Sequence, residues 1–148
     1  IHLFRNTIKN NILGNYKFVD DEWMLECSKV SGTDEFVKLH PMGYDMPIGE
    51  RGAGLSGGQR QSVGIARALV NDSNIWLFDE PTNAMDQTSE NNILRKLKEN
   101  IENRTLLLVT QKMNILDLVT RVIVMNNGEK VLDDKKTEVI KKLGANNG

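Results

Sequence analysis

LSGGQRQ at residues 55–61 and IWLFDEPT at residues 75–82 are the two stretches that decide the fold of this chain. In the first, Ser56 and Gln59 form an S-x-x-Q capping box, and apolar residues then recur on one face, which predicts a helix over 56–70. In the second, four large apolar residues precede two adjacent carboxylates. A strand that is apolar on both faces is typical of the interior of a parallel sheet.

Strand and helix patterns alternate from this point to the end of the chain. The predicted strands cover residues 75–78, 105–109, 122–125 and 130–132. Asn127-Gly128, between the last two, has the composition of a type I′ hairpin turn. Further helices are expected over residues 7–13, 20–30, 33–39, 87–101, 114–119 and 137–143, with a loop over 40–54. This order predicts the back half of an α/β domain with an added hairpin.

The predicted helices have apolar faces that should enter the core. These faces comprise Ile93, Leu94, Leu97 and Ile101 on one helix and Val139, Ile140 and Leu143 on the last. Thr33 is expected to cap its helix. Cys27, the only cysteine, lies on the apolar face of the helix over 20–30 and cannot form an internal disulfide, so a buried thiol is predicted.

Composition narrows the class of protein. The 148 residues make one domain or part of one, and 39% apolar residues suffice for a core. A net charge of −1 gives no indication of a nucleic-acid partner. No apolar run in these residues approaches the ~20 residues of a membrane span, and we expect no signal peptide among them. The sequence starts at Ile1 rather than at methionine, so we expect it to be a piece of a longer protein.

The glycine-rich turn has the chemistry of an anion site. Ser56 offers a hydroxyl, and Gly57 and Gly58 would let backbone N–H groups approach a ligand without a Cβ between them. The helix N-terminus behind them adds roughly half a positive charge. The alternative is an ordinary capped helix, which the capping box taken alone favours.

The acidic strand end supplies a different chemistry. Asp79 would lie at the carboxyl edge of a buried strand, where open α/β sheets bind ligands, and could hold Mg²⁺ through water. Glu80, one position further on, is expected to point in a different direction from Asp79 and could polarise an attacking water. The alternative is a solvated strand end. The two features together predict one half of a nucleotide-triphosphate site. The other half is missing, because the phosphate-loop motif G-x-x-x-x-G-K-[ST] does not occur in the sequence.

These stretches resemble a known family. LSGGQRQ resembles the signature motif of ATP-binding cassette (ABC) ATPases, and IWLFDEPTNAMD at 75–86 resembles their Walker B strand and D-loop. HLFRNTI at 2–8 looks like the segment after the Q-loop, and GYDMPIGERG at 43–52 looks like the loop before the signature in exporters. That loop is most similar to those of type I secretion ATPases, which export unfolded proteins.

The resemblance implies a fold and an assembly. The fold would be a P-loop NTPase (RecA-like) α/β domain with an incomplete parallel sheet over residues 1–148. Residues 5–54 would form the ABC helical subdomain, and residues 55–148 the signature helix and the C-terminal half of the core. The implied partners are a second nucleotide-binding domain in a head-to-tail dimer and the exporter's transmembrane domains, at the cytoplasmic face of the inner membrane. A periplasmic adaptor and an outer-membrane channel would join through the full transporter.

The resemblance also implies site residues, with ATP and Mg²⁺ as cofactors. Asp79 would bind the metal and Glu80 would be the general base. The remaining nucleotide-site residues would be Leu55, Ser56, Gly57, Gly58, Gln59 and Asp86. Of these, the serine and glycines would contact a γ-phosphate held by the partner cassette, Gln59 would cap the signature helix, and Asp86 would lie at the dimer interface.

Gln111 departs from the family pattern, which has a switch histidine at this position. A glutamine amide can donate a hydrogen bond but stays neutral. We expect Gln111 to slow turnover rather than to abolish nucleotide binding, and we expect no activity from residues 1–148 alone. Two alternatives stay open: a truncated or degenerate cassette that binds a partner without turnover, and a soluble ABC protein acting on DNA or the ribosome. The exporter-like residues 49–52 disfavour the latter.

Overall fold

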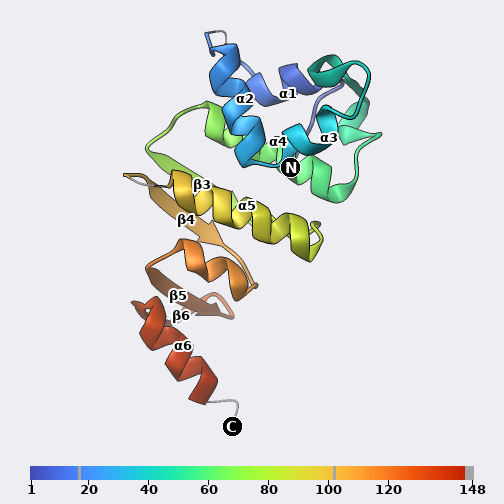
Figure 1. Ribbon diagram of the computed structural model, residues 1–148. Helices are drawn as coiled ribbons and strands as arrows, with labels where there is room; N and C mark the ends of the chain where they lie inside the picture. Colours follow the sequence, from blue (N-terminus) through green and yellow to red (C-terminus); the bar gives the residue numbers. More distant parts are fainter. Residues whose placement is uncertain (17, 102, 146–148) are drawn as a thin grey trace. The chain divides into compact units, whose positions relative to one another are not determined.

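The computed structural model describes residues 1–16, 18–101 and 103–145, and the chain forms two compact units, Ile1–Val109 and Thr110–Gly148. Within the first unit, the long helix α4 (Gly57–Val70) packs against three shorter helices (Figure 1). These are α1 (Ile8–Leu13), α2 (Asp21–Val30) and α3 (Thr33–Val37). The apolar side of α4 lies in the core, as predicted, because its apolar residues recur at helical spacing.

Helix starts follow the local sequence where a side chain can cap them. Thr7 accepts a hydrogen bond from the Asn10 N–H at 3.1 Å, and Asp20 stands in the same position before α2. The expected cap at Thr33 is wrong. Gly32, at φ 77°, occupies the cap position, and Thr33 is the first helical residue. The chain reverses through the left-handed region here, which glycine adopts without strain.

The segment expected as a loop over 40–54 contains short regular pieces. They are the 3₁₀ turns η1 (Gly43–Asp45) and η2 (Glu50–Gly52) and the strand β2 (Pro47–Ile48), which pairs antiparallel with β1 (Asn6–Thr7). Both strands are two residues long, so no hydrophobic alternation in the sequence could reveal them.

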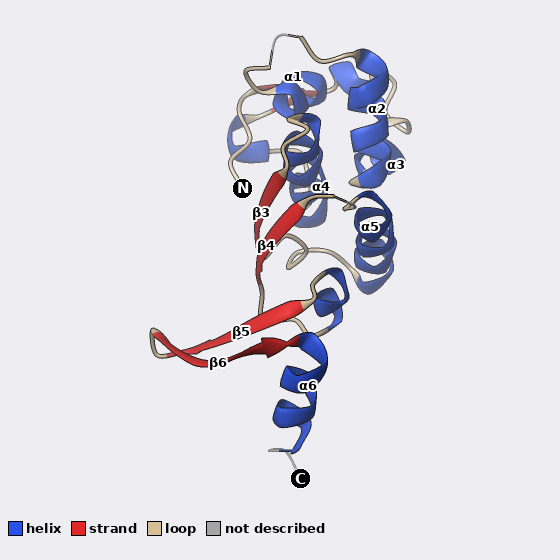
Figure 2. Cartoon of the chain, turned by 90° about the vertical axis from the view of Figure 1, so that its left-hand side faces the viewer, coloured by secondary structure: helices blue, strands red, loops and turns tan. Residues whose placement is uncertain are grey.

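Strands β3 (Ile75–Asp79) and β4 (Thr105–Val109) pair parallel and in register, with α5 (Gln87–Asn100) between them in sequence and beside them in space (Figures 1 and 2). Trp76 and Phe78 are buried, whereas Ile75 and Leu77 are 57% and 68% exposed. The prediction that both faces of β3 are buried is therefore wrong for the described chain, because helices cover only one side of this two-stranded sheet.

The buried stripe of α5 is only partly as expected. Ile93 and Leu97 are buried, Leu94 and Ile101 are half-buried, and Glu90 completes the stripe. The Glu90 carboxylate accepts a hydrogen bond from the Thr82 hydroxyl at 2.5 Å, which offsets part of the cost of burying it.

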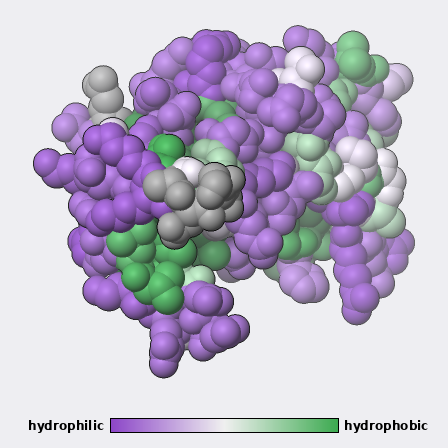
Figure 3. Space-filling view, turned by 90° about the horizontal axis from the view of Figure 1, so that it is seen from below, coloured by the Kyte–Doolittle hydropathy of each residue, from purple (hydrophilic) through white to green (hydrophobic). Residues whose placement is uncertain are grey.

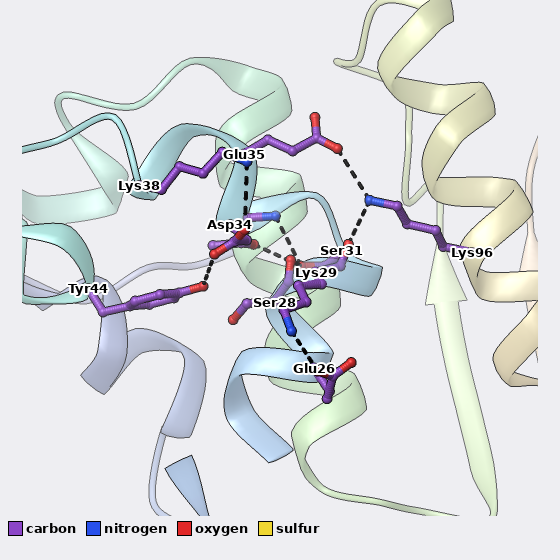
Figure 4. A network of polar contacts seen from close by, with 10 residues as sticks. Glu26, Ser28, Lys29, Ser31, Asp34, Glu35, Lys38, Tyr44 and Lys96 are labelled. Carbon is purple, nitrogen blue, oxygen red and sulfur yellow. Dashed lines mark hydrogen bonds and ion pairs between the residues drawn. The ribbon is translucent and has the colours of Figure 1, made fainter. Parts of the chain in front are cut away.

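A polar network joins α5 to α2 and α3 (Figure 4). Lys96 donates to the Lys29 carbonyl at 2.8 Å and to the Glu35 carboxylate at 3.2 Å. Close by, Tyr44 donates to Asp34 at 3.1 Å. The network therefore fixes α2 and α3 against α5 through charged side chains at the rim of the core.

Cys27 lies in the core of the first unit, as predicted. Its side chain is almost fully buried, and burial raises the pKa of the thiol to about 12. A thiol that stays protonated is a poor nucleophile, so the residue has a packing role.

The second unit consists of η3 (Asn114–Leu118), a hairpin of β5 (Arg121–Asn126) and β6 (Glu129–Lys135), and α6 (Lys136–Ala145). Asn127 and Gly128 both have positive φ, as the predicted type I′ turn requires. Both strands extend beyond the predicted ranges, because backbone pairing continues from Asn126 opposite Glu129 to Arg121 opposite Lys135. The Arg121 side chain also forms an ion pair with Asp133 at 2.7 Å. The Arg121 guanidinium and then the Lys130 ammonium hold the pKa of Asp133 well below its usual range.

The predicted apolar face of α6 is narrower than expected. Val139 is buried and Leu143 half-buried, but Ile140 is 43% exposed, so its expected place in the core is wrong. The helix packs against the hairpin, and Lys136 in its first turn also pairs with Asp117 of η3 at 3.0 Å, so only a narrow strip of its apolar side chains is covered.

Most of the surface visible in Figure 3 is hydrophilic, with separate hydrophobic areas. The longest described helices, α4 and α5, have 14 residues each, and none of the described helices has the length and apolar character needed to cross a membrane.

Candidate functional site

The signature turn, residues 55–59, is fixed by its own hydrogen bonds. Ser56 accepts from the Gln59 N–H at 3.1 Å, and the Gln59 side chain accepts from the Ser56 N–H at 2.9 Å, so the predicted capping box is confirmed. Leu55 is buried, and its carbonyl accepts from the Arg60 guanidinium at 2.6 Å. The Ser56 side chain is exposed at the start of α4. Because its oxygen accepts the Gln59 N–H, its O–H can still donate outward.

Gly57 and Gly58 lie against the segment that resembles the D-loop. A Cβ on Gly57 would stand 2.8 Å from the Ala84 Cβ, and one on Gly58 would stand 3.2 Å from the Ala84 carbonyl oxygen. The structure therefore gives the glycines a role that sequence reasoning missed. They allow the chain after β3 to approach α4 more closely than side chains would permit.

The acidic pair ends β3 in two different environments. Asp79 is the last residue of the strand, opposite Val109, and its side chain is exposed. Glu80 is half-buried and has φ 44°, in the left-handed region. A residue with a Cβ adopts this region at a cost on the order of 1 kcal/mol. The backbone therefore leaves the extended conformation at Glu80, directly after the end of β3.

Gln61 holds the turn after β3, which runs from Glu80 to Ala84. Its side-chain Nε2 donates to the Glu80 carbonyl at 3.2 Å, and its Oε1 accepts from the Ala84 N–H at 2.9 Å. Sequence reasoning missed this residue. The contact spans 19 and 23 positions along the chain, and no local pattern reports a separation of that size.

Asp86 ends the turn and starts α5. Its carboxylate accepts from the Ser89 hydroxyl at 2.6 Å and from the Ser89 N–H at 3.0 Å. These bonds, the hydroxyl first, lower the pKa of Asp86. Asp86 thus caps a helix within its own chain, and its expected place at a dimer interface stays a prediction.

An open pocket of about 310 Å³ brings several of these residues together. Its lining includes Ser56, Gly58 and Gln59 of the signature turn together with Met85 and Asp86. The signature turn and the segment after the acidic pair therefore share one surface. Within the part of the chain that the structure describes, no group of three or more acidic, histidine or cysteine side chains could hold a metal ion. Asp79 would therefore need water or a ligand to complete a cation's coordination.

Gln111 belongs to the second unit, two residues after the end of β4. Its side chain is exposed, and beside it the Thr110 hydroxyl accepts from the Lys112 N–H at 3.0 Å. Its place beside Glu80 stays a prediction.

The parallel βαβ unit, the capped glycine-rich helix start and the acidic strand end place this chain among α/β proteins that can bind anionic ligands at a helix N-terminus and at the carboxyl ends of the strands. The family profile described as ABC transporter matches residues 2–83. The chain therefore belongs to the ABC transporter family.

Relatives of known name agree with this assignment. The chain is 38% identical over 139 residues to the leukotoxin export ATP-binding protein LtxB of Aggregatibacter actinomycetemcomitans, covering 94% of this chain and 20% of that protein. It is 36% identical over 145 residues to the alpha-hemolysin translocation ATP-binding protein HlyB of Escherichia coli O157:H7, covering 91% and 20%. The chain thus spans about a fifth of the length of these relatives.

The fold is similar to that of a solved transporter. A bacterial Atm1-family ABC exporter with ATP bound superposes with a TM-score of 0.88 at 30% identity, over 97% of this chain and 25% of that one. The incomplete α/β fold expected from the sequence is confirmed by this neighbour and by the small parallel sheet.

Proposed function

We propose that this chain is the signature-bearing part of the nucleotide-binding domain of an ABC exporter, and that the full-length protein hydrolyses ATP to drive export. The observation that carries the proposal is the contact between the signature turn and the turn after Glu80, made through Gly57 and Ala84. Two motifs far apart in sequence meet at one surface, which an ordinary capped helix does not require. The names of the toxin-export relatives support the exporter assignment.

The signature turn would bind phosphate without a lysine. The exposed Ser56 side chain and the first N–H groups of α4 lie at the positive end of a 14-residue helix. A γ-phosphate carried by a second nucleotide-binding domain would fit these donors. In this arrangement the two domains associate head to tail, and the pocket beside Asp86 belongs to their interface.

The end of β3 would divide the hydrolytic work between two carboxylates. Asp79, exposed at the carboxyl edge of the sheet, would hold Mg²⁺ through water, and its exposed oxygens fit that ion. When bound, the metal would neutralise charge that develops on the phosphates. Glu80 would accept a proton from the attacking water, and Gln111 would donate a hydrogen bond toward the γ-phosphate.

The assembly follows from the same proposal. Residues 5–54 would form the helical subdomain that contacts the transmembrane domains, and residues 55–148 the signature helix and the remaining core. The protein would act at the cytoplasmic face of the inner membrane in type I protein secretion, with a periplasmic adaptor and an outer-membrane channel. The similarity to LtxB and HlyB favours this substrate class.

Steady-state hydrolysis by the purified full-length transporter in lipid nanodiscs tests the proposal. We expect Mg²⁺-dependent ATP hydrolysis that falls at least tenfold in an Asp79→Asn variant. A matched Asp72→Asn variant, on an exposed turn before β3, should retain the wild-type rate. A wild-type protein that binds nucleotide without hydrolysing it would instead favour the degenerate cassette.

Gln111→His in the full-length transporter should raise kcat about two- to tenfold, because an imidazole adds stronger hydrogen-bond donation near the γ-phosphate. The measurement is kcat for ATP hydrolysis at saturating Mg-ATP, with nucleotide affinity measured in parallel and expected to stay constant. An unchanged or lower kcat would show that Gln111 does not limit turnover.

A further inference from the structure

Gln61 connects α4 to the acidic strand end through one side-chain amide. The amide donates to the Glu80 carbonyl at 3.2 Å and accepts from the Ala84 N–H at 2.9 Å. A carbonyl faces one end of the amide and an N–H faces the other, so only one orientation of the group satisfies both. Because the amide is planar and rigid, these bonds fix the two ends of the turn relative to each other.

The backbone of Glu80 is held on both sides. Its N–H donates to the carbonyl of Val109, the residue opposite Asp79 in the last pair of β3 and β4, at 2.9 Å. Its carbonyl accepts the Gln61 amide, while the Asn83 N–H lies at the longer distance of 3.5 Å. These contacts hold a φ of 44° that a glutamate seldom adopts.

The direction of the Glu80 side chain depends on this backbone conformation. Rotation of φ out of the left-handed region would swing the Cα–Cβ bond and carry the carboxylate with it. Gln61 lies one helical turn after Gly57, so it connects the first turn of the signature helix to the residue whose carboxylate must face water.

We propose that Gln61 is a positioning residue that directs the Glu80 carboxylate by holding the Glu80 backbone in the left-handed conformation. The inference rests on the proposed function, in which Glu80 acts on the attacking water. Gln61 itself touches neither water nor nucleotide in this role; it acts through the peptide group of Glu80.

Two variants of the full-length transporter test the role. Gln61→Leu removes both hydrogen bonds. Gln61→Glu has nearly the same shape and keeps an acceptor for the Ala84 N–H, but it presents an oxygen instead of a donor to the Glu80 carbonyl. This variant tests the role if the leucine variant does not fold. Each should lower kcat for ATP hydrolysis about 10- to 100-fold, the size expected when a reacting group is displaced by about 1 Å. KM and the affinity for Mg-ATP should stay within about twofold of wild type.

A double-mutant comparison separates positioning from general destabilisation. In a Glu80→Gln background, Gln61→Leu should cause no further loss, because the group it directs is already gone. Asn100→Leu is the matched control: Asn100 also donates its amide to a backbone carbonyl, that of Lys96 at 2.8 Å, but lies at the exposed end of α5. This variant should hydrolyse ATP at the wild-type rate.

Near wild-type kcat in Gln61→Glu would overturn the inference, and so would an equal fractional loss from Gln61→Leu with and without Glu80. Failure of the proposed function gives a different pattern. The wild-type transporter would then not hydrolyse ATP, or Glu80→Gln would hydrolyse it as fast as the wild type, whatever residue stands at position 61.

Discussion

Glu80→Gln in the full-length transporter should lower kcat for ATP hydrolysis about 100- to 1,000-fold while leaving the affinity for Mg-ATP nearly unchanged. General-base catalysis contributes a factor of this size, and a neutral amide cannot accept the proton of the attacking water. The substitution preserves shape. The backbone bonds of Glu80 to Val109 and Gln61 involve main-chain atoms of Glu80, so they remain in the variant.

The measurement compares single-turnover hydrolysis with equilibrium binding of a fluorescent ATP analogue in the same preparation. Glu99→Gln is a matched control. Glu99 is an exposed carboxylate on α5 that pairs with Arg95 at 2.8 Å, and its loss should not alter hydrolysis. A Glu80→Gln protein that hydrolyses ATP within a few-fold of wild type would show that another group activates the water.

Local sequence signals predicted the elements that position the site. Ser56 and Gln59 predicted the start of α4, and the structure confirms both capping bonds. The apolar run over 105–109 predicted β4 to the residue. These predictions succeeded because capping and strand formation depend on side chains within a few positions of one another.

The parts that sequence reasoning missed depend on distant residues. The bond from Gln61 to Glu80 and the fit of Gly57 against Ala84 appear only when α4 and the chain after β3 are packed together. The exposure of Ile75 and Leu77 on one face of β3 has a similar cause. Leu77 has the apolar character of a buried position, but burial depends on whether another element covers it.

Gly57→Ala in the full-length transporter should lower kcat for ATP hydrolysis about 10- to 100-fold. The new methyl group would stand 2.8 Å from the Ala84 Cβ, so α4 or the turn after Glu80 must move. Inserting one carbon into a packed contact costs about 1–3 kcal/mol, which corresponds to this range in rate if the active arrangement bears the cost. Helix propensity acts in the opposite direction, since alanine favours a helix more than glycine does.

A size exchange shows which partner makes glycine necessary. Ala84→Gly removes the methyl group that the new side chain meets, so Gly57→Ala combined with Ala84→Gly should recover to within about threefold of wild type. If glycine is needed instead for a nucleotide to approach the N–H groups of α4, the double variant will stay as slow as Gly57→Ala. Gly144→Ala is the control, because a Cβ at Gly144 meets no atom of the described chain within 4 Å. If kcat is low in Gly57→Ala and recovers when Ala84→Gly is added, the signature turn and the chain after Glu80 act as one packed unit.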